Sequence, residues 1–428
     1  MTEQILTTRM DAHPSDSHTL SVYEQTGGYQ ALRKALGMKP EEIAEEVKVS
    51  NIAGRGGAGF PTGVKWGFLA PAQPRYLVIN ADESEPGTFK DRQLLERDPH
   101  QLVEGIVISA YALAANRAFV YVRGEYPRPA RRVHAAIEEA RQAGYIGEDI
   151  LGSGFSLDVS VHLGAGAYIC GEETALLNSL EGLRGEPRIK PPFPAVEGLY
   201  GKPTIVNNVE TISNIPWIVT NGGAAYDAIG PEGSKGTRLF SVSGHIERPG
   251  NYEIVMGMTW RNLIYDLGGG VRGGKDLKAW IPGGASAPWL TPEHLDEPIT
   301  IQACARLGTM LGSGGIVVMD ETTNVVAAAL SLVRFFAHES CGQCTPCREG
   351  ATWLERILER ILHGEGRPSD LDLLLDVSDN ISPGLKWPPA MTTICPLGPS
   401  AVSPITSIMT HFRDEVAAMV GGEVPAGV

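Results

Sequence analysis

A run of three cysteines near the C-terminal end is the feature that most constrains how this chain can fold. Cys341, Cys344 and Cys347 have the spacing C-x2-C-x2-C. Thiolates at this spacing can converge on one centre from a tight loop, but an iron–sulfur cubane requires four of them. The fold must therefore bring a distant cysteine to this loop.

Cys395 is the candidate for the fourth ligand, because Pro396 follows it as in bacterial ferredoxin-type runs. The sequence has no second triplet, so a single [4Fe–4S] cluster is predicted. The alternative is structural zinc, which usually takes two separated C-x2-C pairs. Of the other two cysteines, Cys170 and Cys304 are expected to pack in the core. The four ligands predict an electron-transfer protein.

A glycine-rich loop lies far upstream of the cysteines. Residues 54–59 read Gly-Arg-Gly-Gly-Ala-Gly, which matches the G-x-G-x-x-G fingerprint of dinucleotide-binding proteins. That fingerprint needs a strand before it and a helix after it, whereas a helix-like segment, residues 40–48, precedes this loop and Phe-Pro follows it. Taken alone, the loop is equally compatible with a tight structural turn. Its bare N–H groups can still approach a phosphate or a flat ring, and Arg55 and Lys65 add positive charge.

Three further polar clusters accompany this loop. They read Asn-Ala-Asp-Glu-Ser-Glu-Pro-Gly at residues 80–87, Tyr-Ile-Cys-Gly-Glu-Glu-Thr at 168–174 and Val-Asn-Asn-Val-Glu-Thr at 206–211. Four such clusters in a chain with an iron–sulfur cluster predict a cofactor pocket. A flavin fits it, because a hydride carries two electrons whereas a cluster accepts one at a time, so something must split the pair.

Hydrophobic periodicity predicts the domain organisation. Residues 1–27 form an N-terminal arm, whose first 25 residues we expect to be mobile. In residues 28–234 strands alternate with helices, which predicts an α/β domain with a largely parallel sheet and ligand loops at the carboxyl ends of its strands. Residues 235–323 predict a small α+β module, and residues 324–428 a helical bundle around the cysteine motif.

Charge and hydropathy exclude other classes. The net charge is −14 and no dense Lys/Arg cluster appears, which argues against nucleic-acid binding. The first 20 residues have no apolar core, so we expect no signal peptide. The most apolar stretches, residues 105–115 and 325–333, are too short to span a membrane. We therefore expect a cytosolic protein, or one held at a membrane by a partner.

Together these motifs resemble the NADH-binding flavoprotein subunit of respiratory complex I, the 51 kDa or F subunit. The resemblance extends from about residue 28 to about residue 415 and rests on residues 54–63, 80–88, 164–175 and 339–350. The family implies a Rossmann-like flavin domain, a ubiquitin-like β-grasp (SLBB-like) module and a four-helix bundle that holds the [4Fe–4S] cluster. These parts match the three segments predicted above.

The resemblance also implies site residues. The family binds FMN noncovalently, and motif matching assigns it Gly54, Arg55, Gly56, Lys65, Asn80, Asp82, Ser84, Gly171, Val206, Asn207, Asn208 and Thr211. The NADH side is assigned Gly57, Ala58, Phe60, Lys65, Phe68, Glu85, Tyr168, Glu172, Glu173 and Phe193. The residues expected to act in catalysis are Glu85, Tyr168, Glu172 and Glu173. The three phenylalanines are expected to hold the adenine, and Glu173 to repel the extra phosphate of NADPH.

In this family NADH gives a hydride to FMN, and single electrons then pass through the cluster to a partner and on towards quinone. The implied partners are a small thioredoxin-like [2Fe–2S] subunit (24 kDa or E type) and a multi-cluster subunit (75 kDa or G type). The implied location is cytoplasmic, peripheral on the inner face of the plasma membrane. The extent of the match favours a complex I subunit over the diaphorase subunit of an NAD-reducing hydrogenase or NAD-dependent formate dehydrogenase. A non-catalytic binding scaffold is a further alternative, which flavin absorbance and NADH–ferricyanide activity would distinguish.

Overall fold

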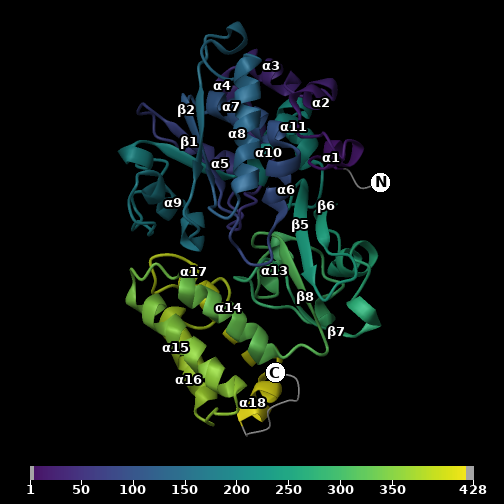
Figure 1. The fold of residues 1–428 in the computed structure, drawn as a ribbon, viewed down its shortest axis with the longest axis vertical. Coiled ribbons are helices and arrows are strands. Elements are labelled where there is room, and N and C mark those ends of the chain that lie inside the picture. Colours follow the sequence, from purple (N-terminus) through teal and green to yellow (C-terminus); the bar gives the residue numbers. More distant parts are fainter. Residues whose placement is uncertain (1–3, 421–428) are drawn as a thin grey trace. The chain divides into compact units, whose positions relative to one another are not determined.

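The computed structural model describes residues 4–420, which divide into two compact units (Figure 1). The first unit contains the chain up to Ser84, then Thr88–Phe240 and Asn251–Met258. The second contains Glu85–Gly87, Ser241–Gly250 and the chain from Thr259 on. Among the described residues, no helix is long and apolar enough to cross a membrane. The three-domain division with a boundary at residue 235 stays a prediction.

A parallel sheet of four strands, in the order β3-β2-β1-β4, organises the first unit. The strands are β1 (Tyr76–Ala81), β2 (Arg117–Val122), β3 (Asp158–Leu163) and β4 (Thr204–Asn208). Tyr76, the first residue of β1, is in register with Arg117 on one side and with Thr204 on the other, so these three strands begin at the same height in the sheet. Their carboxyl ends therefore share one edge, and three of the four predicted polar clusters meet there.

Helices pack around this sheet. They are α3 (Gln30–Leu36), α4 (Pro40–Val49), α5 (Thr62–Gly67), α6 (Lys90–Arg97), α7 (Pro99–Ala112), α8 (Pro127–Gln142), α9 (Glu173–Leu180), α10 (Val209–Ser213), α11 (Ile215–Asn221) and α12 (Gly223–Asp227). Helix α7 is buried along its whole length up to Ala110, including polar residues. It packs on β1, β2 and α8 and forms the middle of the core.

The N-terminal segment is part of this core, so the expectation of a mobile arm is wrong for residues 4–25. It contains helices α1 (Thr8–Ala12) and α2 (Leu20–Gln25), and Leu6, Met10 and Tyr23 are buried in the main hydrophobic cluster. The segment is held at its start by Glu253 of strand β6 (Gly250–Val255), whose carboxylate accepts hydrogen bonds from the backbone N–H groups of residues 5–7. Its apolar residues are spaced too irregularly for their burial to be read from periodicity. The first three residues lie outside the described part of the chain.

The second sheet contains four strands in the order β6-β5-β8-β7. They are β5 (Thr237–Gly244), β6 (Gly250–Val255), β7 (Leu277–Ile281) and β8 (Gly315–Asp320). Strand β8 runs parallel to β5 and antiparallel to β7. A short helix, α13 (Ile301–Arg306), and a π-helical turn, Asn262–Leu267, belong to the same region. Mixed strand directions agree with the predicted small α+β module.

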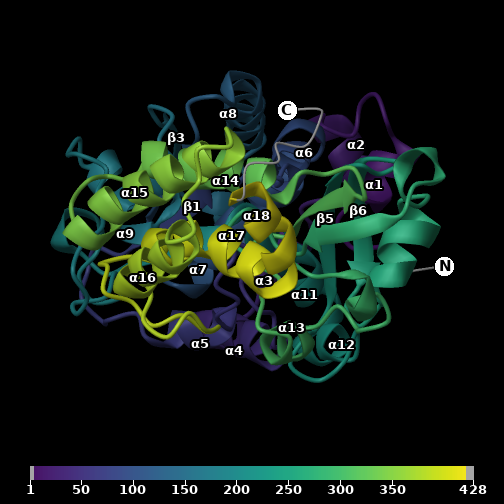
Figure 2. The same ribbon diagram turned by 90° about the horizontal axis from the view of Figure 1, so that it is seen from below.

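The C-terminal residues form helices that pack side by side (Figure 2). The helices are α14 (Val325–Glu339), α15 (Thr345–Leu362), α16 (Asp370–Ile381), α17 (Leu397–His411) and the shorter α18 (Arg413–Val420). Asn324 begins α14 by accepting hydrogen bonds from the N–H groups of Val326 and Ala327. Helix α15 buries the apolar face predicted from its spacing, including Leu354, Ile357 and Ile361.

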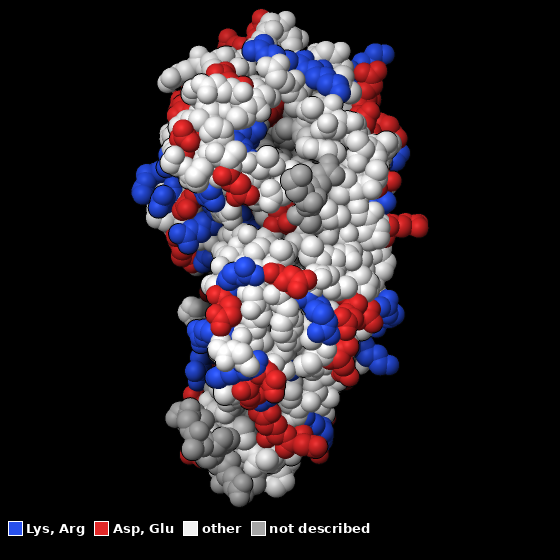
Figure 3. Space-filling view, turned by 90° about the vertical axis from the view of Figure 1, so that its right-hand side faces the viewer, with Lys and Arg blue, Asp and Glu red and all other residues white. Residues whose placement is uncertain are grey.

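Charged side chains are mixed over the surface. On the face drawn in Figure 3, Lys and Arg are interspersed with Asp and Glu, and broad uncharged areas separate them. No extended basic surface appears on this face, in agreement with the net charge of −14.

Candidate functional site

The glycine loop is closed on itself and seated against the start of α10. Gly54 N–H donates to the carbonyl of Phe60 over 2.9 Å, which closes the loop. The backbone N–H of Arg55 donates to Thr211 Oγ1 over 2.8 Å. A Cβ added to Gly56 would lie 3.0 Å from the Cβ of Asn208. A larger residue would therefore fit here only if Asn208 moved slightly. The predicted loop and the predicted cluster at residues 206–211 therefore form one structure.

The side chain of Arg55 points into the protein rather than into this loop. It is 1% exposed, and its Nη2 donates to Tyr226 Oη, to the Lys235 carbonyl over 2.7 Å and to the Thr237 carbonyl over 2.9 Å. The expectation that this guanidinium adds positive charge near a phosphate is therefore wrong, because its N–H groups are used by carbonyls inside the protein. Its contacts anchor the loop to the segment that enters β5. A cofactor contact by the rest of Arg55 stays a prediction.

The end of β1 is joined to the segment that precedes α9. Asn80 Nδ2 donates to the Gly171 carbonyl over 2.8 Å. Asn80 Oδ1 accepts from the N–H of Asp82, whose Oδ1 in turn accepts from Ser84 Oγ over 2.7 Å. A Cβ on Gly171 would lie 3.5 Å from Asp82. The structure thus brings together four residues that the resemblance assigns to FMN.

Two lysines hold the paired glutamates at the start of α9. Lys65 Nζ lies 2.9 Å from Glu173 Oε2, and Lys190 Nζ lies 2.8 Å from Glu172 Oε1 and 3.6 Å from Glu173 Oε1. Burial alone would raise the pKa of Glu173, but Lys65 and then Lys190 outweigh it and hold that pKa below its usual value. Glu172 also caps α9, because its side chain accepts from the N–H groups of Thr174 and Ala175. Sequence reasoning missed Lys190.

Exposed aromatic rings lie beside these charges. Phe60, Phe68 and Phe193 are 47%, 59% and 57% exposed, which is unusual for side chains of this size. The Phe60 and Phe68 ring centroids are 6.2 Å apart. The segment carrying Phe193 lies next to that carrying Phe68, because Ala70 N–H donates to the Ala195 carbonyl. Exposed rings gathered near a carboxylate and a lysine suit the stacking of a flat, charged ligand.

Glu85 and Tyr168 complete the predicted set. Tyr168 begins the short 3-10 turn Tyr168–Gly171, directly before the glutamate pair. Glu85 belongs to the second unit, where its Oε1 accepts from the N–H of Ser286 over 2.7 Å. Trp66 adds a residue that sequence reasoning missed: its Nε1 donates to Asn207 Oδ1 over 2.9 Å. Asn207 and Val206 lie on β4, at the sheet edge where the clusters meet.

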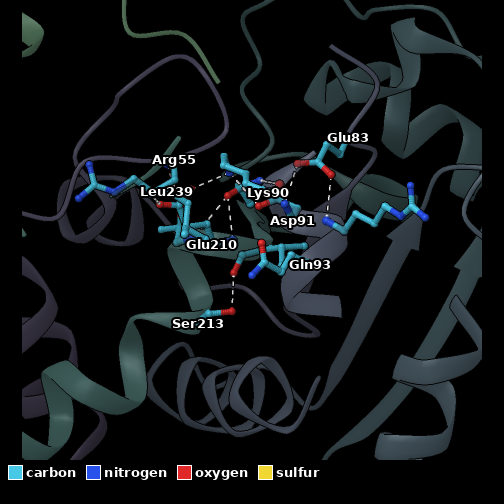
Figure 4. Close-up of polar contacts among 12 residues, drawn as sticks. Arg55, Glu83, Lys90, Asp91, Gln93, Glu210, Ser213 and Leu239 are labelled. Atoms are coloured by element: carbon cyan, nitrogen blue, oxygen red, sulfur yellow. Dashed lines mark hydrogen bonds and ion pairs between the residues drawn. The ribbon is translucent and has the colours of Figure 1, made fainter. Parts of the chain in front are cut away.

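A buried ionic network of Lys90, Asp91 and Glu210, with Glu83 next to it, is drawn in Figure 4. Lys90 Nζ is 2.8 Å from Asp91 Oδ1 and 2.7 Å from Glu210 Oε2, and all three side chains are at most 4% exposed. Asp91 Oδ2 accepts from Asn208 Nδ2 over 2.6 Å. Glu83 accepts from the N–H groups of Asp91 and Arg92, at the start of α6. Burial, and then the charge of Asp91, raise the pKa of Glu83 to about 8.

Cys341 and Cys344 lie in the turn between α14 and α15, and Cys347 lies in the first turn of α15. Helix α14 ends at Glu339, and Cys344 is the residue before the first residue of α15. Gly342 has φ +78°, a left-handed conformation that favours glycine and reverses the chain inside the C-x2-C loop. Burial raises the pKa of Cys347 to about 11; the Ser340 hydroxyl opposes this, and Cys344 and Cys341 add to it. The three cysteines thus share one short loop and the first turn of the helix that follows it.

Cys395 lies at the same end of the bundle. Gly350 and Gly398 each follow a cysteine by three residues, and both pack on Ile381 at the end of α16. A Cβ on Gly350 would lie 2.6 Å from Ile381 Cδ1, and one on Gly398 would lie 3.0 Å from Ile381 Cγ2. The N-terminal parts of α15 and α17 therefore pack on the same residue of α16, which places Cys347 and Cys395 at one end of the bundle.

The donor set is one that iron–sulfur clusters use. Four thiolates with no carboxylate or imidazole among them are typical iron–sulfur ligands. Within residues 4–420, no three His, Cys, Asp or Glu side chains are grouped closely enough to hold one metal ion.

Comparisons with known families agree with this assignment. Residues 47–217 match the Nuo51 FMN-binding domain, residues 238–318 match the SLBB domain, and residues 327–419 match the NADH-ubiquinone oxidoreductase-F iron-sulfur binding region. Fold and site thus define a flavin- and iron–sulfur-binding oxidoreductase. The F subunit of the NADH-quinone oxidoreductase of Mycobacterium tuberculosis (strain ATCC 25618 / H37Rv) is 52% identical over 416 residues, which are 95% of this chain and 92% of that protein. This chain belongs to the family of F subunits of NADH-quinone oxidoreductase.

Two further likenesses bear on the alternatives. The relative named as F subunit 2 of NADH-quinone oxidoreductase, in Rhizobium meliloti (strain 1021), is 50% identical over 423 residues, 98% of each chain. The crystal structure of an NAD+-reducing [NiFe]-hydrogenase in the H2-reduced state has a TM-score of 0.84 and 34% identity, and the match covers 98% of this chain and 67% of that chain. The higher identity and fuller coverage favour the complex I subunit over the hydrogenase alternative. The cofactors are FMN and one [4Fe–4S] cluster.

Proposed function

We propose that this chain is the NADH-oxidising subunit of a respiratory NADH:quinone oxidoreductase. The observation that carries the proposal is the seating of the glycine loop on Asn208 and Thr211, beside the charged pair Lys65–Glu173. A glycine loop without the usual strand–loop–helix context would thereby form one wall of the cofactor site. The carboxyl ends of β1, β3 and β4, which share one edge of the parallel sheet, would supply the other walls.

FMN fits the residues at this edge. Asn80, Asp82 and Ser84 supply amide, carboxylate and hydroxyl groups that are already ordered by one another, and Gly171 leaves space beside them. Asn207 and Asn208 are fixed by Trp66 and by Asp91. The backbone N–H of Gly56 would face the phosphate of FMN. Ordered polar groups of this kind orient a ring without moving during the reaction.

NADH would bind on the outer side of the same site. The adenine would stack between Phe60, Phe68 and Phe193, and Glu172 and Glu173 would contact the ribose side. Lys65, which reaches Glu173, would compensate charge near the phosphates. Glu85 and Tyr168 would lie near the reacting nicotinamide. None of these groups has to transfer a proton to the substrate, so their task is to position it.

The cofactors supply the redox chemistry: bound FMN accepts a hydride, two electrons at once, and the [4Fe–4S] cluster takes electrons one at a time. The chain contributes order and burial at both places. Cys341, Cys344 and Cys347 would ligate the cluster from the loop before α15 and its first turn, and Cys395 from the segment before α17; both helices pack on Ile381. Helix N-termini favour negative charge, which suits an anionic thiolate cluster.

The finer assignments follow from the family. The first unit would correspond to a Rossmann-like flavin domain, the SLBB module to a ubiquitin-like β-grasp, and α14–α17 to a four-helix bundle. The electrons would leave to a small [2Fe–2S] subunit of the E type and a multi-cluster subunit of the G type. In that assembly the chain would lie at the cytoplasmic face of the plasma membrane without entering the bilayer.

Purified protein tests the proposal directly. It should show flavin absorbance, four irons per chain, an EPR signal after reduction and NADH–ferricyanide activity. The variant Cys395→Ser should lose the EPR signal, whereas Cys304→Ser, which changes a buried cysteine of α13, should keep it. Protein without flavin and without NADH–ferricyanide activity would support the scaffold alternative. Proteins that copurify with the native complex would separate complex I from a hydrogenase.

A further inference from the structure

The hydroxyl of Ser340 is in contact with one cluster ligand. Ser340 directly follows the last residue of α14, and its Oγ lies 3.3 Å from Cys347 Sγ. The same Oγ accepts a hydrogen bond from the N–H of Gly342 over 3.4 Å. Ser340 therefore bridges the loop that carries Cys341 to the first turn of α15, which carries Cys347.

The direction of the hydrogen bond follows from the chemistry of the groups. A hydroxyl has one proton and two lone pairs, and Gly342 N–H already occupies a lone pair of Ser340 Oγ. A cysteine that binds iron is a thiolate and has no proton to give. In the loaded protein Ser340 must therefore be the donor and Cys347 Sγ the acceptor.

The sulfur that receives this bond is the buried one. Cys347 is 5% exposed, whereas Cys341 and Cys344, in the same motif, are partly exposed. Water can hydrogen-bond the sulfurs of Cys341 and Cys344 but cannot readily replace a donor at Cys347. A hydrogen bond to the Cys347 sulfur is electrostatically strong, because the low-dielectric surroundings screen the interaction little.

We propose that Ser340 raises the reduction potential of the cluster by donating a hydrogen bond to the Cys347 thiolate. A donor aimed at a ligand sulfur favours the more negative state of the cluster, which is the state after it has gained one electron. The electron comes from reduced flavin and leaves to the partner; no bond forms or breaks, and the proton stays on Ser340 Oγ. The inference rests on the proposed assignment of Cys347 as a cluster ligand.

A second contact makes this effect separable from the folding of the loop. Arg348 Nη1 donates to the Gly342 carbonyl over 2.8 Å, and the Arg348 side chain is 46% exposed. The cysteine loop is thus held by a guanidinium that does not depend on Ser340. Replacing the Ser340 hydroxyl should leave the loop and its cluster in place.

The test is an EPR-monitored redox titration of the purified full chain with its cluster. For Ser340→Ala we expect a midpoint potential lower by about 59 mV, a tenfold change in the ratio of reduced to oxidised cluster. Ser340→Thr, which keeps a hydroxyl, should restore the parent value. The matched control is Thr352→Val, which removes an α15 hydroxyl that donates to the Arg348 carbonyl. Its midpoint should equal that of the parent.

Iron content and spectra decide between the possible outcomes. A Ser340→Ala protein with four irons per chain and an unchanged midpoint overturns the inference. Loss of iron from Ser340→Ala, with iron retained in Thr352→Val, also overturns it, because the hydroxyl would then hold the loop and not tune the cluster. A parent protein without any cluster signal would instead contradict the proposed function.

Discussion

Lys65 Nζ lies 2.9 Å from Glu173 Oε2 and so ties the helix after the glycine loop to the first residue of α9. Lys190 approaches the other carboxylate oxygen at 3.6 Å. The two lysines hold the pKa of Glu173 low, so this carboxylate stays charged at neutral pH although it is partly buried. A fixed negative charge at this place is a means of rejecting a ligand with an extra phosphate.

The first prediction therefore concerns nicotinamide preference. Glu173→Gln should raise kcat/KM with NADPH about tenfold, because it removes roughly 1.4 kcal/mol of charge repulsion in the NADPH complex. Steady-state ferricyanide reduction with each nucleotide measures it. Glu148→Gln, which removes the same charge from an exposed loop, is the control. An NADPH-to-NADH ratio equal in Glu173→Gln and in the control would contradict the placement of Glu173.

The second prediction concerns the retention of flavin. Trp66→Phe keeps the buried ring but removes the Nε1–H that donates to Asn207 Oδ1. Losing one such bond costs about 1 kcal/mol, so the FMN dissociation constant should rise about fivefold. Recovery of free-flavin fluorescence on dilution measures this. Trp217→Phe, at a partly buried tryptophan of α11, should bind FMN as the parent does; equal weakening in both variants would mean a general loss of packing.

Short runs of sequence predicted which polar segments come together at the edge of the first sheet. Residues 54–59, 80–87 and 206–211 each carry several polar or glycine positions in succession, and a parallel sheet brings the ends of its strands to one edge. The cysteine motif was readable for a similar reason, since its spacing alone limits the geometry. Local composition, together with the rule that parallel strands end at one edge of a sheet, was enough to predict that the polar clusters meet.

Contacts between distant segments were not readable in this way. Lys90 and Asp91 look like ordinary surface charges in sequence, yet they are buried because Asn208, 117 residues after Asp91, and Glu210 lie against them. Arg55 is a second example. A cation in a glycine loop suggested a contact with a phosphate, but its guanidinium donates hydrogen bonds to the carbonyls of Lys235 and Thr237. Only the folded structure shows which partner a charged side chain meets.

The third prediction concerns pH. Burial and Asp91 raise the pKa of Glu83 in the folded protein to about 8, far above its value in an unfolded chain. The folded state then holds the extra proton, so this group stabilises the protein at low pH, and its contribution falls as pH rises from about 4.5 to about 8. Glu83→Gln cannot ionise and should escape that loss.

Thermal unfolding of the two proteins at pH 5.5, 6.5 and 7.5 measures the difference. The stability of Glu83→Gln relative to the parent should rise with pH, by at most about 1.4 kcal/mol per pH unit for one proton. Glu148→Gln should show no such slope. A relative stability independent of pH would mean that Glu83 is already ionised, held so by the N–H groups of Asp91 and Arg92.

The last prediction concerns the N-terminal segment, whose start is fixed by one carboxylate. Glu253 is 6% exposed and accepts from the N–H groups of Ile5, Leu6 and Thr7 and from two threonine hydroxyls. In Glu253→Gln an amide NH2 would face some of these donors, and groups left unpaired in a buried place cost about 1–3 kcal/mol. The midpoint of thermal unfolding should fall by roughly 2–12 °C, and proteases should cut first within residues 4–25. Glu247→Gln, at an exposed glutamate that accepts one N–H from Gly273, should change neither property; cleavage elsewhere first would show that the segment is held mainly by its apolar contacts.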